Sequence, residues 1–360
     1  MVLPRLTMNE SRFASAAGVL LSLCALVLVF AGLHEWDVPL ARLVRSLSLG
    51  SSPAPHPWLA LLSDLGDRIG KGDLLVVLSL VLLAVGYGLS QQQWKDAGRQ
   101  SLIAHGLVAV IANIIKHAVG RPRPKFLDTA NFEFAPVHGS GWDSFPSGHA
   151  SAAFAVATVL AIRFPRLRWP LFAVAMGVAA SRVVRGSHFL TDVAGGAVLG
   201  CVMGVIAVHP WREWRVSASR AIGRIAPFCV AMLVVLWTVL RFPSETWLFH
   251  SLVWGGMVVA LAGLGGHVLW SVQRSCPPWL SGHLARAVMG LGFGMTTGSL
   301  FVTTAVLFVC AAHWLAGPEQ DGPSADGSAG LQVAIAESVF AVAVLVLVAA
   351  SYVVKGIVPM

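Results

Sequence analysis

The stretch SRVVRGSHFLTDVAGGAVLGCVMG, residues 181–204, joins charged side chains to a long apolar run. Arg182, His188 and Asp192 stand in its first half, and the second half is apolar. Apolar runs of roughly 17 to 25 residues cross a lipid bilayer as helices. The stretch therefore places these ionisable groups, together with Arg185, where one membrane span ends and the next begins.

The composition of the whole chain also indicates a membrane protein. Of its 360 residues, 56% are hydrophobic and only 12% are charged, whereas an ordinary soluble domain carries about 25% charged residues. We expect an all-α, polytopic membrane helix bundle with about ten spans. The predicted spans are 14–33, 73–90, 101–118, 149–165, 170–183, 192–209, 225–241, 250–270, 287–315 and 331–353.

The net charge of +8 is not gathered into a basic patch on a soluble domain, so no nucleic-acid partner is expected. Most basic residues fit an N-terminus on the inner side of the membrane, because inner segments are rich in Lys and Arg. Six of the eleven exceptions gather at or beside two outer loops, where an anionic ligand is the simplest explanation: Lys116, Arg121, Arg123, Lys125, Arg182 and Arg185. The five cysteines form no CxxC pair, so neither a disulfide framework nor a metal site is expected.

The segment between the first two spans, 34–72, has mixed polarity. We interpret it as a connector that lies along the membrane interface, rather than as a lid over a substrate.

Two further stretches join the opening one at the outer face. KHAVGRPRP, 116–124, ends the third span, and FPSGHAS, 145–151, begins the fourth. Arg123 and Lys116 supply the positive charge that phosphate requires. Free backbone N–H groups around Ser147 and Gly148, at a helix start, can bind the same anion. The three stretches together predict one anion site.

Two histidines complete the predicted site. His188 and Asp192 are four residues apart, so on a helix the carboxylate can hold one imidazole nitrogen while the other enters the site. This arrangement is typical of an activated nucleophile or base. His149 lies beside the predicted anion cradle, where a protonated imidazole can donate to a leaving oxygen.

These residues match a known three-part signature. Lys116 followed after six residues by Arg123-Pro124, the string from Pro146 to His149, and Ser181-Arg182 followed by His188 and Asp192 all fit its spacing. The chain thus resembles the type 2 phosphatidic acid phosphatase superfamily over about residues 14–209. The resemblance implies a six-span core with its site at the outer surface.

The resemblance also implies a metal-independent phosphatase without a cofactor. His188 would attack phosphorus and form a phosphohistidine, Asp192 would orient His188, and His149 would protonate the leaving oxygen. The phosphoryl oxygens would be held by Lys116, Arg123, Ser147, Gly148 and Arg182. Arg121, Lys125 and Arg185 lie outside the signature and are interpreted as interfacial charges, with a second phosphate or lipid headgroups as the alternative ligands.

The predicted domains are a six-span core at 1–210 and a four-span C-terminal region at 211–360. The C-terminal region has no assigned role; a structural collar, a dimer surface that would make a homo-oligomer, and a lipid-binding groove are the alternatives. We expect a bacterial inner membrane, with both termini cytoplasmic and the site on the outer face.

The predicted function is removal of a phosphate from an outer-leaflet lipid. Undecaprenyl diphosphate is the first candidate substrate, on family breadth alone, ahead of lipid A phosphate, phosphatidylglycerophosphate and phosphatidic acid. Three alternatives stay open: transfer of the phosphoryl group to another lipid, hydrolysis of a small soluble phosphomonoester as in the glucose-6-phosphatase branch, and a lipid transporter or scramblase with a degenerate core.

Overall fold

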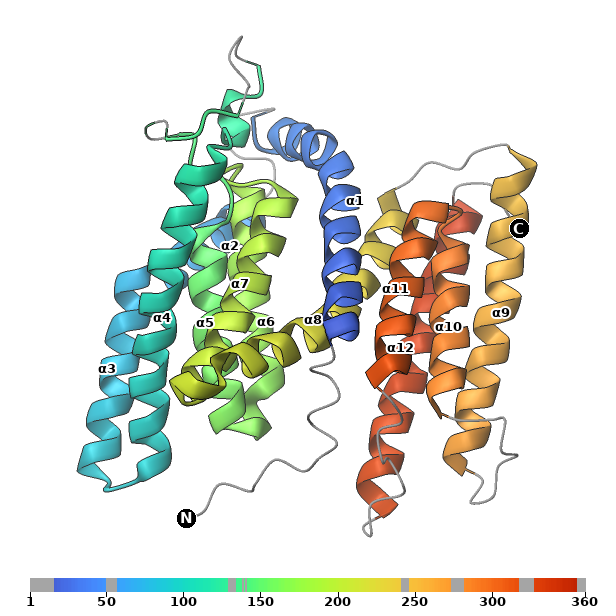
Figure 1. Ribbon diagram of the computed structural model, residues 1–360. Helices are drawn as coiled ribbons and strands as arrows, with labels where there is room; N and C mark the ends of the chain where they lie inside the picture. Colours follow the sequence, from blue (N-terminus) through green and yellow to red (C-terminus); the bar gives the residue numbers. More distant parts are fainter. Residues whose placement is uncertain are drawn as a thin grey trace. The chain divides into compact units, whose positions relative to one another are not determined.

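A computed structural model of the chain describes residues 16–49, 57–128, 134–137, 139, 141–240, 246–272, 282–316 and 327–354. These residues form the helices α1 to α12 with short 3-10 turns between some of them, and the described part contains no strand (Figure 1). Six of the described helices are long and apolar enough to cross a membrane, and a bent pair, Ala60–Ile69 with Gly72–Gly88, would make a seventh. The all-α membrane bundle predicted from the sequence is confirmed.

The chain forms two compact units, each with its own internal contacts. One comprises Leu33–Ile225, and the other comprises Met1–Gly32 together with Ala226–Met360. All residues of the predicted site belong to the unit Leu33–Ile225. The division into domains at 1–210 and 211–360 stays a prediction.

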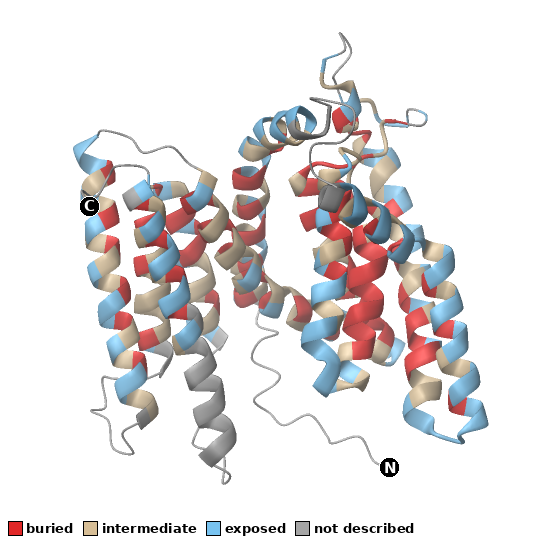
Figure 2. Ribbon diagram, turned by 180° about the vertical axis from the view of Figure 1, so that it is seen from behind, coloured by how far each residue is buried: buried red, intermediate tan, exposed pale blue. Residues whose placement is uncertain are grey.

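The unit that carries the site is built around α5. Its helices are the second half of α1 (Ala16–Leu49), α2 (Pro57–Ile69), α3 (Gly72–Gly88), α4 (Gln92–Val119), α5 (Gly148–Arg163), α6 (Arg168–Val184), α7 (Leu190–Val208) and the start of α8 (Trp214–Leu240). Figure 2 shows α5 buried along most of its length, and residues 150–160 are all buried. A helix that is apolar on every side, as α5 is, lies in the centre of a bundle.

Glycines on α7 bring it against α5. A Cβ atom on Gly200 would lie 2.3 Å from the carbonyl oxygen of Ser151, and one on Gly204 would lie 2.7 Å from that of Ala155. Such close backbone approach requires a residue without a side chain, as is common where membrane helices pack. The two helices therefore run side by side from their N-termini, which both lie at the predicted site.

The second unit contains α9 (Trp247–Val272), α10 (Gly282–Thr296), α11 (Leu300–Ala316) and α12 (Gly327–Val354). The single span predicted at 287–315 is wrong, because α10 ends at Thr296 and α11 begins at Leu300. Gly298 in the turn has a φ of 62°, a left-handed conformation that glycine adopts without strain. The Thr297 hydroxyl donates to the carbonyl oxygen of Gly294 at 2.6 Å and accepts from the N–H of Ser299 at 3.2 Å. This hydroxyl satisfies part of the interrupted backbone. The turn, TTGS at 296–299, holds no charged residue, so the sequence shows no strongly polar break there.

Candidate active site

The site lies where α4 and α6 end and α5 and α7 begin. Gly120 ends α4 with a φ of 58°, and its N–H donates to the carbonyl oxygen of Lys116 at 2.8 Å. A left-handed glycine is a common helix stop. A Cβ atom there would lie 2.1 Å from the carbonyl oxygen of Ala135, so the loop that follows packs directly on the helix end. The N–H of Arg123 then donates to the carbonyl oxygen of Gly141 at 3.0 Å, in the loop that leads to the second signature stretch.

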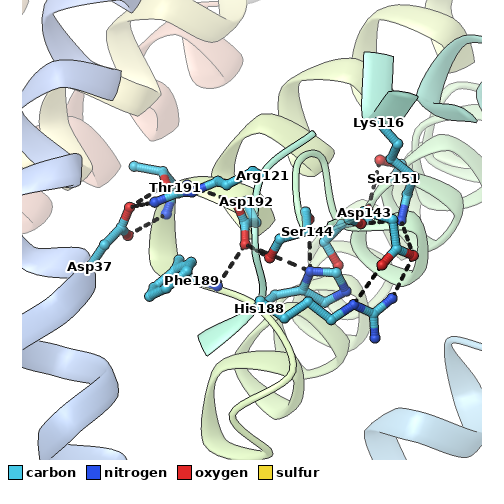
Figure 3. Close-up of polar contacts among 12 residues, drawn as sticks. Asp37, Lys116, Arg121, Asp143, Ser144, Ser151, His188, Phe189, Thr191 and Asp192 are labelled. Carbon is cyan, nitrogen blue, oxygen red and sulfur yellow. Dashed lines mark hydrogen bonds and ion pairs between the residues drawn. The ribbon is translucent and has the colours of Figure 1, made fainter. Parts of the chain in front are cut away.

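His188 is buried, and its Nδ1 lies 2.8 Å from the carbonyl oxygen of Ser144 (Figure 3). A carbonyl oxygen only accepts hydrogen bonds, so Nδ1 carries the proton and Nε2 keeps its lone pair. The carboxylate of Asp192 is farther away, 3.7 Å from Nδ1. His188 and Asp192 thus lie at ion-pair distance rather than in a short hydrogen bond, and Ser144 contacts both: its carbonyl oxygen bonds His188, and its hydroxyl donates to Asp192 Oδ2 at 2.5 Å.

The pKa of His188 is lowered. Burial lowers it first, and the positive charges of Lys116 and Arg123 lower it further, against the opposing effect of Asp192. Lys116 and Arg123 act on His188 although they come from another signature stretch, so the fold brings these stretches together. A neutral imidazole with a free Nε2 is the form that a nucleophile requires.

Asp192 is completely buried and fully bonded. Its side chain accepts the N–H of Phe189 at 2.8 Å, which caps the start of α7, and Arg121 Nη1 at 2.8 Å. A carboxylate in the first helical turn is favoured by the helix dipole. Its backbone carbonyl accepts the N–H of Ser147 at 2.9 Å. The start of α7 is thus tied to the start of α5.

The predicted anion cradle at the start of α5 needs one correction. The N–H of Ser147 is not free, because it donates to Asp192. The N–H groups of Gly148 and His149 stand in the first turn of α5 and have no acceptor within the helix. The hydroxyl of Ser147 is buried and has no hydrogen-bond partner in the described part of the chain. The side chain of Ser147 and the two following N–H groups therefore make up the cradle.

Lys116 and Arg123 both contact Asp143. Arg123 forms a two-pronged pair with this carboxylate, Nε to Oδ1 at 2.9 Å and Nη2 to Oδ2 at 2.7 Å. Lys116 Nζ donates to the carbonyl oxygen of Asp143 at 2.7 Å and lies 3.6 Å from Oδ2. Burial raises the pKa of Asp143, but the hydrogen bond from Arg123 and the charges of both cations outweigh it and hold the pKa below its usual range. Asp143 is therefore ionised and holds the two cations side by side.

Arg182 and His149 share a different carboxylate. Arg182 Nη1 donates to Asp67 Oδ1, and His149 Nε2 lies 3.6 Å from the same oxygen. Arg182 Nε and His149 Nε2 are both buried atoms without a hydrogen-bond partner in the described structure. Unpaired buried polar atoms are costly unless a ligand or water bonds them. Both residues thus keep a group available for a bound anion.

The structure adds residues that the sequence reasoning missed. Arg121 is not an interfacial charge: it is buried and bonds Asp37 through Nη2 at 2.6 Å and Asp192 through Nη1 at 2.8 Å. Asp37 also accepts the N–H of Thr191 at 3.0 Å (Figure 3). Segment 34–72 is therefore more than a connector, since it carries Asp37 on α1 and Asp67 on α2. An ionisable residue within an apolar helix, as Asp37 is, was the available signal.

Comparisons with known proteins match the part of the chain that carries this site. The model of the PAP2 superfamily matches residues 98–216. The lipid A 1-phosphatase of Rhizobium johnstonii is 33% identical over 178 residues, which cover 45% of this chain and 72% of that protein. The phosphatidylglycerophosphatase B of Bacillus subtilis is 31% identical over 160 residues, 41% of this chain and 73% of that protein. A solved structure, the PAP2-type phosphatidylglycerolphosphate phosphatase of Bacillus subtilis, is 26% identical, covers 54% of this chain and 94% of its own, and has a TM-score of 0.41.

The chain belongs to the PAP2 superfamily, the type 2 phosphatidic acid phosphatases that its three signature stretches resemble. It is an integral membrane protein of this class.

Proposed function

We propose that the chain is a lipid phosphatase that removes a phosphate through a phosphohistidine on His188. The observation that carries this proposal is a set of buried polar atoms without partners in the described structure: Ser147 Oγ, His149 Nε2 and Arg182 Nε. Each belongs to a signature residue, and each can donate to a phosphoryl oxygen when it carries a proton. An anionic ligand supplies acceptors for all three at once.

In the proposed reaction, Nε2 of His188 attacks phosphorus while Nδ1 stays bonded to the Ser144 carbonyl oxygen. Lys116, Arg123 and Arg182 neutralise the charge that develops on the phosphoryl oxygens, which is usually the largest part of such catalysis. His149 gives a proton to the leaving oxygen, and a water molecule then hydrolyses the phosphohistidine. The hydroxyl of Ser147 and the N–H groups of Gly148 and His149 hold the remaining oxygen.

The first candidate substrate is lipid A that carries a 1-phosphate, because the Rhizobium johnstonii relative, 33% identical, is a lipid A 1-phosphatase. Phosphatidylglycerophosphate follows, since the Bacillus subtilis relative is named for it. Undecaprenyl diphosphate, favoured from the sequence, and phosphatidic acid complete the panel.

The proposed location is a cytoplasmic membrane, with the N-terminus inside and the site at the outer surface. The basic residues of the inner segments support this orientation. The break between α10 and α11 changes the side proposed for the C-terminus. With two crossings in place of one, the C-terminus lies outside instead of inside.

The test is a substrate panel on purified protein in detergent, with a chelator present throughout. We expect wild type to release inorganic phosphate from at least one of the four lipids and His188→Ala to release none. Labelled donor lipid with unlabelled acceptor lipids distinguishes hydrolysis from transfer, since transfer moves the label into a second lipid. A wild-type protein that releases no phosphate from any of the four would refute the proposal.

A further inference from the structure

Asp67 belongs to α2, outside every signature stretch, and yet its carboxylate lies among the cations of the site. Its Oδ1 accepts a hydrogen bond from Arg182 Nη1 and lies 3.6 Å from His149 Nε2. Its Oδ2 lies 3.9 Å from Arg185 Nη1. One carboxylate therefore contacts a residue predicted to bind phosphate, the residue predicted to donate the proton, and a third basic residue.

The packing of α2 places Asp67 there. A Cβ atom on Gly66 would lie 2.2 Å from Ser181 Oγ, and one on Gly70 would lie 2.5 Å from Val178 Cγ1. These two glycines flank Asp67 in sequence and allow α2 to lie directly on α6, the helix that carries Arg182. Arg182 has only 7% of its side chain exposed, so Asp67 neutralises a cation that water barely reaches.

The pair with Arg182 is incomplete. Arginine binds carboxylate or phosphate best with two parallel N–H groups. Asp67 takes Nη1, while Nε of Arg182 is buried and has no hydrogen-bond partner in the described structure. Asp143, by contrast, accepts both Nε and Nη2 of Arg123. Nε and Nη2 form one edge of the guanidinium group, as the pair of Arg123 with Asp143 shows. Arg182 can therefore offer this edge to a phosphate while Nη1 keeps its bond to Asp67.

We propose that Asp67 is a counter-anion that holds Arg182 by Nη1, leaves its Nε edge for the phosphate, and by its own negative charge weakens the binding of phosphate. The inference rests on the proposed function and adds a positioning residue to it. The carboxylate of Asp67 stays on Arg182 when phosphate binds, so its negative charge opposes that of the bound anion. Asp67 thereby weakens product binding and speeds product release.

The test measures binding of inorganic phosphate, and of orthovanadate as its analogue, to the full-length protein in detergent by calorimetry. We expect Asp67→Asn to bind both anions about tenfold more tightly than wild type, because a negative charge beside the bound anion is removed. In the lipid assay, Asp67→Asn should lower KM and kcat together, as expected when release of product becomes slower. A residue with only a structural role would not tighten anion binding.

The matched control is Asp64→Asn, on the same helix. Asp64 carries the same charge three residues away, has 67% of its side chain exposed and contacts Arg185 at 3.4 Å. We expect Asp64→Asn to bind phosphate as wild type does. Equal affinities in Asp67→Asn and Asp64→Asn, or weaker binding in Asp67→Asn, would overturn the inference.

A second measurement applies if Asp67→Asn is unstable without added phosphate. Phosphate should then raise the Tm of Asp67→Asn more than that of wild type or Asp64→Asn, because it binds this variant more tightly. An equal rise in all three proteins argues against the inference. If wild type binds phosphate but hydrolyses no lipid, the proposed function fails, and the Asp67 comparison is still decided by binding.

Discussion

The protonation of His188 is expected to determine how the proposed activity falls at acidic pH. Its neutral form is the nucleophile, and burial together with the charges of Lys116 and Arg123 lowers its pKa. Protonation, and with it the loss of activity, should therefore occur below the ordinary histidine value of about 6.5. We expect kcat/KM to hold its plateau down to a pH of about 6.5 and to fall only at lower pH.

The substrate phosphate also ionises in this pH range, and a variant distinguishes its ionisation from that of His188. Asp192 opposes the lowering of the His188 pKa, so Asp192→Asn should move the acidic limb to still lower pH, whatever residual rate it keeps. The substrate is the same in both profiles and cancels in the comparison. An acidic limb that stays in place or moves upward in Asp192→Asn would show that His188 is not the group observed.

Asp37 is expected to stabilise the fold through Arg121. Its side chain is fully buried and pairs with the equally buried Arg121. Removing one partner of a buried ion pair costs about 3–5 kcal/mol, because the other charge loses its compensation. Arg121 keeps Asp192 as a second partner, so we expect Asp37→Asn to lower stability by about 3 kcal/mol, measured as a decrease of Tm in detergent.

The control for this prediction is Asp128→Asn. Asp128 pairs with Arg45, but 63% of its side chain is exposed, and exposed pairs contribute about 0 to 1 kcal/mol. Its Tm should stay close to that of wild type. Equal losses in the two variants would contradict the account of Asp37 as a buried anchor of the site.

At the scale of the element, the contact between α5 and α7 determines the geometry of the site. Gly200 lies where α7 crosses the backbone of Ser151, so closely that a Cβ atom on Gly200 would be 2.3 Å from the Ser151 carbonyl oxygen. We expect Gly200→Ala to force the helices apart at a cost of about 1–3 kcal/mol. Because the Ser147 N–H bonds the Asp192 carbonyl between the same two helices, kcat should fall as well. Stability is measured by Tm, and activity by phosphate release.

Gly106→Ala on α4 is the matched control, since a Cβ atom there meets nothing within 4 Å. Alanine is favoured over glycine inside a helix by about 1 kcal/mol. We expect this variant to be as stable as wild type or slightly more stable, with unchanged activity. If Gly200→Ala behaves in the same way, the close packing of α5 on α7 does not hold the site.

At the scale of the whole molecule, the unit Leu33–Ile225 has a site end and an opposite end. Phe134 lies in the loop at the site end, with 58% exposure, and Trp211 follows the far end of α7, with 73% exposure. Phe134→Cys and Trp211→Cys should therefore lie on opposite sides of the membrane, in a protein whose native cysteines are replaced. A membrane-impermeant maleimide added to intact spheroplasts should label Phe134→Cys only.

Lysis of the spheroplasts is the control, since both cysteines should then react. Labelling of Trp211→Cys alone before lysis would place the site on the cytoplasmic side and reverse the proposed orientation.

Much of the site could be predicted from local sequence. The spacing of Lys116 and Arg123, the helix start at Ser147 and Gly148, and the pair His188 and Asp192 all depend on residues close in the chain. The all-α membrane fold followed from the lengths of apolar runs, because a segment that crosses a bilayer must satisfy its own backbone hydrogen bonds, and a helix does so. The break at Gly298 escaped this reasoning, since the turn holds only small uncharged residues and the Thr297 hydroxyl satisfies part of its backbone.

The sequence by itself determined the class of protein and the residues that can act in catalysis or phosphate binding. Only the tertiary structure decided which carboxylate pairs with which cation. Asp37 bonds Arg121 across 84 residues, Arg182 bonds Asp67 across 115, and Ser144 stands between His188 and Asp192. The physical reason is that local spacing fixes which groups share one helix face, whereas a buried charge takes its partner from whichever helix packs against it.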